Sequence, residues 1–122
     1  MSKTYVSIIE GAEEKQNSIF KYKSFRNDII DLEDRIEIIG ELPGINKEDI
    51  DVDFRGQYLR VKVLSKPVKN EEYKYLLQEI PSGCFYNKYL ISNIDIDGIT
   101  ASYENGLLKI VLPKEDKIIK CD

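Results

Sequence analysis

Residues 99–113 read ITASYENGLLKIVLP, and their pattern is that of two β-strands joined by a tight turn. Apolar residues alternate with polar ones on both sides of Asn105-Gly106, at positions 99, 101 and 103 before it and 108, 110 and 112 after it. Such period-two alternation indicates strands that bury one face. Asn-Gly is the strongest short signal for a two-residue β-hairpin turn. We therefore predict a hairpin that ends at Pro113.

Similar short apolar stretches fill residues 28–91, separated by turn residues at intervals of roughly 8 to 12. Besides the hairpin, the predicted strands are 28–32, 35–42, 50–55, 58–64, 73–80 and 84–91. Pro43-Gly44, Gly56-Gln57 and Pro81-Ser82-Gly83 interrupt them, and Asn46 is placed to begin a single helical turn. Seven or eight strands without a long helix predict an all-β sandwich or barrel.

The chain of 122 residues is long enough for one core. Its first 24 residues mix charges with isolated apolar side chains, and we interpret them as an arm outside the sandwich. No run approaches the roughly 18 apolar residues of a membrane span, and the start lacks the pattern of a secretory signal. We therefore expect a cytoplasmic protein without a membrane partner.

Several function classes lack candidate residues. The chain contains no His, and neither a phosphate-binding glycine loop nor an activated nucleophile is evident. Asn93-x-Asp95-x-Asp97-Gly98 resembles a calcium loop only formally, because its flanks have no helical periodicity. The net charge is −4 and the basic residues are scattered, which disfavours nucleic acid. We expect no enzyme, no cofactor and no metal.

The border strands of a sandwich offer a different chemistry. Their unpaired N–H and C=O groups can receive an extended segment of another chain. Ile99, Ala101 and Tyr103 can form an apolar strip beside such an edge, in which the small Ala101 leaves a hole. The same three residues also suit the core, and the pattern alone favours the core.

Two blocks carry a resemblance to a known family. The first is ELPGINKEDI at 41–50, preceded by DIID at 28–31, and the second is ASYENGLLKIVLPK at 101–114. Gly83-x-Phe85 lies between them. In this order and spacing they resemble the small heat-shock proteins, whose shared unit is the α-crystallin domain.

The resemblance implies an immunoglobulin-like β-sandwich of two antiparallel sheets. Residues 1–24 would form the N-terminal arm, 25–114 the α-crystallin domain and 115–122 a short C-terminal tail. It also implies an oligomeric, ATP-independent chaperone of the stress response, a holdase that binds partly unfolded proteins. The alternatives are a p23-type co-chaperone that serves as an adaptor, and a structural assembly protein with the same sandwich.

The resemblance also implies three sets of site residues. The groove for a partner segment would be formed by Val52 and Phe54 facing Ile99, Ala101 and Tyr103. The homodimer would form where a strand with Tyr73, Tyr75 and Leu76 pairs with the partner's 28–32, which carries Ile29 and Ile30. Clients would bind the arm through Ile8, Ile9, Ile19, Phe20, Tyr22 and Phe25, whose alternative role is packing against the domain.

The sequence departs from the family pattern in two places. The tail has Ile118 and Ile119 adjacent, whereas the family's groove-binding motif is Ile-x-Ile, and adjacent residues of a strand point in opposite directions. Val6-Ser7-Ile8 has the required spacing and is a candidate substitute. Asn87 stands where the family often has an arginine, so any charge pairing between subunits by that arginine is either absent here or made by other residues.

Overall fold

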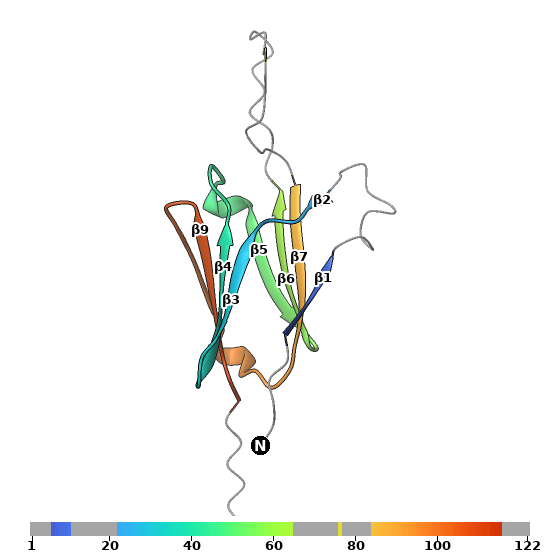
Figure 1. Cartoon of the computed structure of the whole chain (residues 1–122), viewed down its shortest axis with the longest axis vertical. Helices are drawn as coiled ribbons and strands as arrows, with labels where there is room; N and C mark the ends of the chain where they lie inside the picture. Colours follow the sequence, from blue (N-terminus) through green and yellow to red (C-terminus); the bar gives the residue numbers. More distant parts are fainter. Residues whose placement is uncertain (1–5, 11–21, 65–75, 77–83, 116–122) are drawn as a thin grey trace, which may run out of the picture.

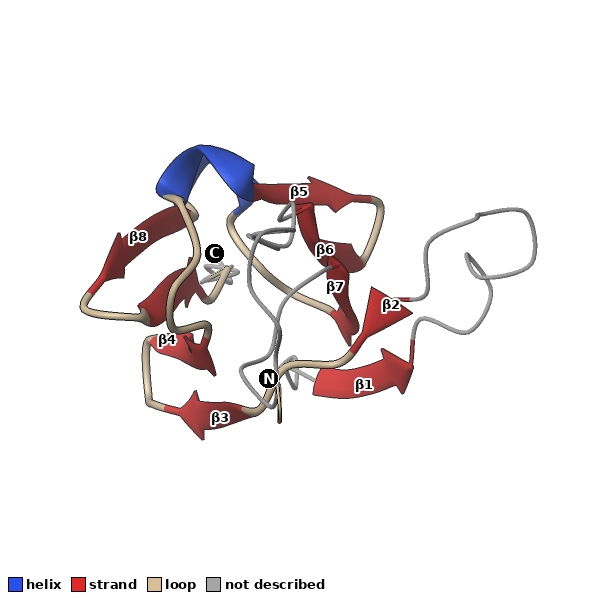
Figure 2. Ribbon diagram, turned by 90° about the horizontal axis from the view of Figure 1, so that it is seen from above, coloured by secondary structure: helices blue, strands red, loops and turns tan. Residues whose placement is uncertain are grey.

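Two β-sheets packed face to face form the fold (Figures 1 and 2). The computed structural model describes residues 6–10, 22–64, 76 and 84–115. One sheet has the strand order β1-β7-β6-β5, with β2 beside β7, and the other has the order β3-β4-β9-β8. The strands are β1 (Val6–Glu10), β2 (Tyr22–Lys23), β3 (Asn27–Asp31), β4 (Arg35–Glu41), β5 (Ile50–Arg55), β6 (Tyr58–Leu64), β7 (Cys84–Ile91), β8 (Thr100–Glu104) and β9 (Leu107–Pro113).

The predicted all-β sandwich is confirmed, and so are the strands from 28 to 64 and from 84 to 113, to within a residue or two at their ends. The predicted strand at 73–80 lies outside the described residues except for Leu76. One pairing departs from the antiparallel expectation, because β2 runs parallel to β7.

The core lies between the sheets and follows from the alternation of each strand. In β6 every second residue is buried, and Leu59, Val61 and Val63 are completely enclosed. Ile36 and Ile38 of β4 face them from the other sheet. Burial of these side chains is the main stabilising term of the fold. The enclosed core cluster also includes Phe25, Leu42, Ile45, Phe85, Tyr89, Ile91, Ile94, Leu108, Ile110 and Leu112.

The hairpin of β8 and β9 turns at the predicted dipeptide. Asn105 has φ 52° and Gly106 has φ 78°, the positive values that a type I′ turn needs. Glu104 pairs with Leu107 directly across the turn. The carbonyl oxygen of Gly106 accepts a hydrogen bond from the N–H of Leu42 at 2.8 Å, which attaches the turn to the segment after β4.

In the described part of the chain, two short 3-10 helices connect strands. The turn predicted after Asn46 is η2 (Lys47–Asp49), which leads into β5. η3 (Ile96–Gly98) lies in the stretch that formally resembles a calcium loop. This stretch connects β7 to β8, so strands flank it in place of the two helices of an EF-hand. No helix in the described part of the chain is long and apolar enough to cross a membrane.

Parts of the N-terminal arm belong to the sandwich. β1 pairs antiparallel with β7 from Val6 opposite Ile91 to Glu10 opposite Asn87, and β2 pairs with the start of β7. The expectation that the first 24 residues lie outside the sandwich is therefore wrong for these two segments. Without them β7 would be an edge strand, and its peptide N–H and C=O groups would have no partners on that side.

Candidate partner-binding groove

β5 and β8 are the last strands of their sheets, and they lie on the same side of the sandwich (Figure 2). Within the described residues no strand pairs with the outer edge of either one. Both edges therefore present peptide groups that can receive an extended segment.

An open groove of about 200 Å³ separates these two edges. It is mainly apolar, with one cation and the hydroxyl groups of Ser102 and Tyr103 among its lining residues. The lining residues are Lys47 of η2, Ile50 and Val52 of β5, Ala101, Ser102 and Tyr103 of β8, and Leu108 of β9. A groove of this size, with a small residue in one wall, accommodates an apolar side chain of an added strand.

The groove residues are neither fully buried nor fully exposed. Val52 and Tyr103 are half-buried and pack against the core, while Ala101 is exposed. The sequence left two roles open for the strip from residue 99 to 103, packing in the core and binding an extended segment. The structure combines them, because the inner part of the side chains completes the core while the outer part remains accessible. Apolar surface that stays accessible beside an unpaired edge indicates a binding site.

The structure brings together three of the five predicted groove residues: Val52, Ala101 and Tyr103. Phe54 and Ile99 are half-buried against the core but do not line the groove. The prediction missed Ile50 and Leu108, although both had a signal. Ile50 shares the inward face of β5 with Val52, and Leu108 pairs directly with Tyr103 across the hairpin.

The hydroxyl group of Tyr103 fixes one end of the groove. It donates a hydrogen bond to the carbonyl oxygen of Leu42 at 2.5 Å and accepts one from the N–H of Ile45 at 3.4 Å. Residues 42–45 lead into η2, which carries Lys47 at the border of the groove. The tyrosine ring is therefore part of the groove wall, while its hydroxyl group positions the loop beside it.

Comparison with known proteins identifies the fold. Residues 28–121 match the Hsp20/alpha crystallin family, which is most of the chain. The chain belongs to this family. It is 32% identical over 98 residues to heat shock protein HSP.16.4 of Streptococcus thermophilus and 35% identical over 94 residues to small heat shock protein C2 of Rickettsia felis. These matches cover 78% and 75% of this chain, and 69% and 61% of the two relatives.

A solved structure agrees with this assignment. The small heat-shock protein of Xylella fastidiosa, whose crystal structure is described as a distinct high order structure, superposes with a TM-score of 0.76. It is 27% identical in sequence, and the superposition covers 84% of this chain and 95% of the Xylella chain. The α-crystallin sandwich expected from the two sequence blocks is thereby confirmed.

The predicted dimer edge of this α-crystallin domain is open in the described part of the chain. β3 is the border strand opposite β8 in its sheet, and nothing described pairs with its outer edge. Ile29 is half-buried against the core, and Ile30 is 39% exposed. Tyr73 and Tyr75 of the predicted partner strand lie outside the described residues, and Leu76 is 96% exposed.

The predicted client-binding residues of the arm differ in their placement. Tyr22 and Phe25 are buried, with exposed fractions of 7% and 5%, so neither is available to a client in this state. Ile8 and Ile9 lie in β1, opposite Tyr89 and Lys88 of β7. Ile19 and Phe20 lie outside the described residues.

The substitute proposed for the missing tail motif is already engaged. Val6-Ser7-Ile8 pairs with β7, on the side of the sandwich away from the groove. Its backbone pairs with the chain's own sheet in this state, and its insertion into another subunit's groove stays a prediction. A strand that is already paired along β7 cannot extend another sheet through the same peptide groups.

The outer face of the sheet that contains β5 carries paired charges. Arg60 makes two hydrogen bonds to the carboxylate of Asp53, at 2.7 and 2.6 Å, and this pair lowers the pKa of Asp53. Lys88 lies 4.5 Å from the centre of the Tyr58 ring. Charged side chains of this kind are typical of a sheet face that is exposed to solvent.

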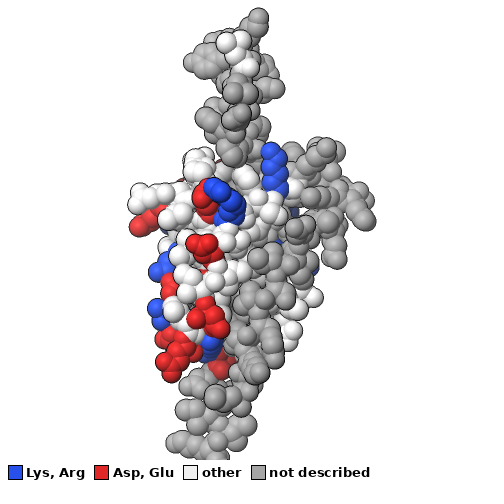
Figure 3. Space-filling model, in the orientation of Figure 1, with Lys and Arg blue, Asp and Glu red and all other residues white. Residues whose placement is uncertain are grey.

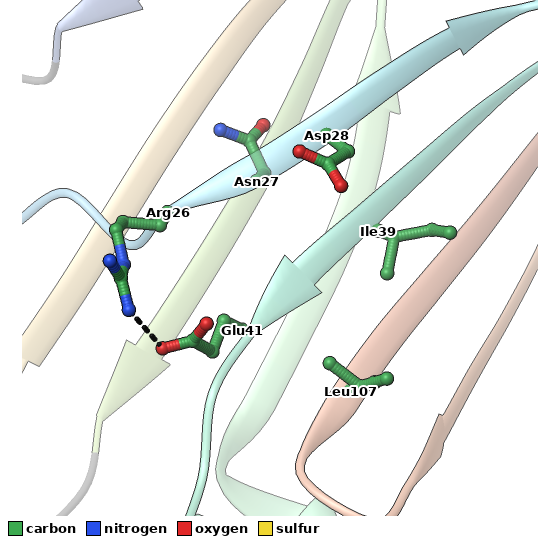
Figure 4. A pocket seen from close by; sticks show the side chains of 6 residues that line it. All are labelled: Arg26, Asn27, Asp28, Ile39, Glu41 and Leu107. Atoms are coloured by element: carbon green, nitrogen blue, oxygen red, sulfur yellow. Dashed lines mark hydrogen bonds and ion pairs between the residues drawn. The ribbon is translucent and has the colours of Figure 1, made fainter.

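The outer face of the other sheet has a hollow of about 530 Å³ beside β3, β4 and β9 (Figure 4). Its border is formed by the ion pair of Arg26 and Glu41 at 2.8 Å, and Ile39 and Leu107 lie on the neighbouring strands. Both ionic side chains are more than half exposed. Acidic and basic groups are interspersed on this side of the molecule (Figure 3). The hollow is thus broad and polar at its border, unlike the apolar groove between β5 and β8.

Proposed function

We propose that this chain is an ATP-independent holdase, which binds partly unfolded proteins and prevents their aggregation in the cytoplasm. The observation that carries the proposal is the accessible apolar groove between two unpaired strand edges. Family membership supports it. Binding of this kind needs no catalytic group, and the function is therefore one of binding without turnover.

The chemistry of the groove suits an unfolded segment. An extended chain can add its peptide groups to the edge of β5 or β8 and place one apolar side chain beside Ala101. Folded proteins keep most such segments buried, whereas partly unfolded ones expose them. The preference for unfolded proteins follows from this difference in exposure.

We also propose a homodimer that assembles further into a larger homo-oligomer. The open edge of β3 and the exposed side chain of Ile30 support a dimer in which the partner's strand near Tyr73, Tyr75 and Leu76 pairs with β3. An unpaired edge with an apolar residue favours association over the isolated subunit.

The apolar residues of the arm are proposed as a second client-binding surface. Ile8, Ile9, Ile19 and Phe20 would contribute together with Tyr22 and Phe25 after these two leave their buried positions. The groove and the arm then contribute separately, and substitutions in one leave the other intact.

Light scattering of a heated model client, measured without ATP, tests the proposal. The wild-type chain is expected to suppress scattering near equimolar ratio. Ala101→Arg places a long charged side chain in the groove and is expected to weaken suppression. Thr100→Arg is the matched control, because Thr100 is also exposed on β8 but does not line the groove.

No suppression by the wild-type chain, together with discrete oligomers, would contradict the holdase and favour the structural or adaptor role. Equal suppression by both arginine variants would instead exclude the groove as the client site. The mass of the oligomer is measured in the same samples, so that a loss of assembly is not mistaken for a loss of binding.

A further inference from the structure

Residues 24–27, here called the strap, cross from one sheet of the sandwich to the other. The strap begins after β2, which pairs with β7, and ends in β3, which pairs with β4 (Figure 2). β2 has only two residues, too few to hold a strand in place by its own pairing. The contacts of the strap must therefore supply most of the attachment.

Asn87 holds the strap through its side-chain amide. Its Oδ1 accepts a hydrogen bond from the N–H of Phe25 at 3.2 Å, and its Nδ2 donates one to the carbonyl oxygen of Phe25 at 3.1 Å. The amide thus pairs with both peptide groups of one residue, as a neighbouring strand would. Asn87 is only 3% exposed, so the loss of this pairing would leave buried polar groups without partners.

The ring of Phe25 fills a space that depends on Gly40. A Cβ atom at Gly40 would lie 2.6 Å from Cε2 of Phe25, well inside van der Waals contact. Phe25 is 5% exposed and belongs to the core cluster. Any side chain at position 40 must therefore displace the ring and, with it, the strap.

The remaining strap residues are also attached. Tyr89 donates a hydrogen bond to Oδ1 of Asn27 at 2.6 Å and accepts one from Nδ2 of Asn87 at 3.1 Å. The carbonyl oxygen of Arg26 accepts a hydrogen bond from the N–H of Glu41 at 2.8 Å. The strap is thus joined to β7 on one side and to β4 on the other.

We propose that the strap is a latch that holds the N-terminal segment on the domain, with Asn87 as its positioning residue and Gly40 as the receptor for Phe25. Release of the latch frees Tyr22 and Phe25, and β1 and β2 then separate from β7 without unfolding of the sandwich. The latch rests on the proposed holdase in one respect, because the freed apolar residues would bind clients.

The latch can open locally while the sandwich stays folded. A small cluster of hydrogen bonds and one aromatic ring opens at a lower free energy than the whole core. The opening exposes apolar side chains and one edge of β7 together, and both are surfaces that an extended segment can bind.

Amide hydrogen exchange of the full chain tests the latch. Asn87→Leu keeps the branched shape of the side chain but removes the amide oxygen and nitrogen. We expect it to raise exchange at residues 6–10 and 22–27 by roughly tenfold or more, since both hydrogen bonds to Phe25 and the one to Tyr89 are lost. The β4, β6 and β9 amides are expected to change much less.

A second pair of variants tests the latch by shape alone. Gly40→Ala is expected to raise exchange in the same segments, because the ring of Phe25 must move. In the Phe25→Ala background the same Gly40→Ala change is expected to add little, since the ring with which it collides is gone. This comparison isolates the contact between the two residues even where Asn87→Leu folds poorly.

Leu112→Ala is the control for a general loss of stability, because Leu112 is fully buried in β9. It is expected to raise exchange throughout the sandwich. Exchange in Asn87→Leu and Gly40→Ala that rises equally everywhere, as in this control, would overturn the latch. So would a Gly40→Ala effect of the same size with and without Phe25.

The exchange result is separate from the chaperone result. If the latch and the holdase are both correct, Gly40→Ala begins to suppress client scattering at a lower temperature than the wild-type chain. Selective exchange without any suppression by any variant would keep the latch and contradict the proposed holdase. Suppression by the wild-type chain with uniform exchange would keep the holdase and contradict the latch.

Discussion

The hydroxyl group of Tyr103 donates a hydrogen bond to the carbonyl oxygen of Leu42, residues that are 61 positions apart in the sequence. One tyrosine thus supplies a wall of the groove and fixes the loop at its end. A groove whose wall is already held in place loses less conformational entropy when a segment binds. The two parts of the side chain can be tested separately.

Tyr103→Phe keeps the ring and removes the hydroxyl group. The carbonyl oxygen of Leu42 and the N–H of Ile45 lose this partner, and we expect the free energy of unfolding to fall by about 1 to 3 kcal/mol. Urea denaturation measures this loss, and amide exchange should rise at residues 43–49. Client suppression below the melting range should remain, because the apolar wall is still present. Unchanged exchange in the loop would show that the hydroxyl group does not hold it.

Two glycines with positive φ should respond differently to alanine. Gly106 has φ 78°, and an added Cβ would lie 3.2 Å from Cα of Pro43, whereas Gly56 has φ 62° and nothing within 4 Å. Both substitutions lower the free energy of unfolding by about 1 to 2 kcal/mol, because alanine disfavours the left-handed conformation. We expect Gly106→Ala to cost roughly 1 kcal/mol more, because it also crowds Pro43. Thermal or chemical denaturation of the two variants provides the comparison, and equal costs would contradict a tight contact with Pro43.

The strands of the domain were predictable because their periodicity is strong. Each half of the hairpin alternates over several residues, and Asn105-Gly106 sets its register without any information from the rest of the chain. The groove was only partly predictable. Alternation identifies which face of β5 turns inward, but not how far along that face the groove extends, which is why Ile50 was missed.

The attachment of the arm was not predictable for a different reason. β2 has two residues, and its partner β7 is distant in the sequence, so no local pattern reports the pairing. The role of Asn87 in this attachment is visible only in the three-dimensional structure. The family resemblance only implies that an arginine is missing at that position, whereas the structure shows an amide that pairs with the peptide groups of Phe25. A polar residue in an otherwise apolar face of a strand is a weak signal of such a role.

Glu37 should make the stability of the domain depend on acid pH. The hydrogen bond from Lys109, at 3.0 Å, lowers the pKa of this carboxyl group, and Arg35 contributes to the same shift. A carboxyl group whose pKa is lower in the folded state stabilises the fold above its unfolded value of about 4.3, and this contribution is lost as the pH falls through the folded value. The wild-type chain should therefore lose stability on acidification from about pH 5 to below pH 4.

Glu37→Gln should flatten that part of the curve. Glu48→Gln is the matched control, because Glu48 is an exposed residue of η2. Urea denaturation at a series of pH values measures both variants. A Glu37→Gln curve that runs parallel to the wild-type curve through the acid range would show that the ion pairs with Lys109 and Arg35 do not stabilise the fold.

Tyr89 should make stability depend on alkaline pH in the opposite direction. Burial raises the pKa of its hydroxyl group to about 12, against about 10 for an unfolded tyrosine. The folded state then keeps a proton that the unfolded state releases. The contribution of Tyr89 is fully present below about pH 10 and is lost as the pH rises towards 12, a total of about 2 to 3 kcal/mol.

Tyr89→Phe is expected to remove this alkaline dependence. The variant should be less stable at neutral pH, since Asn27 and Asn87 lose a hydrogen-bond partner, but its free energy of unfolding should fall less steeply above pH 10. Tyr58→Phe, in an exposed tyrosine of β6, should keep the wild-type slope. Denaturation from pH 9 to 11 separates the two cases, because a Tyr89→Phe curve as steep as that of Tyr58→Phe would mean that another group titrates there.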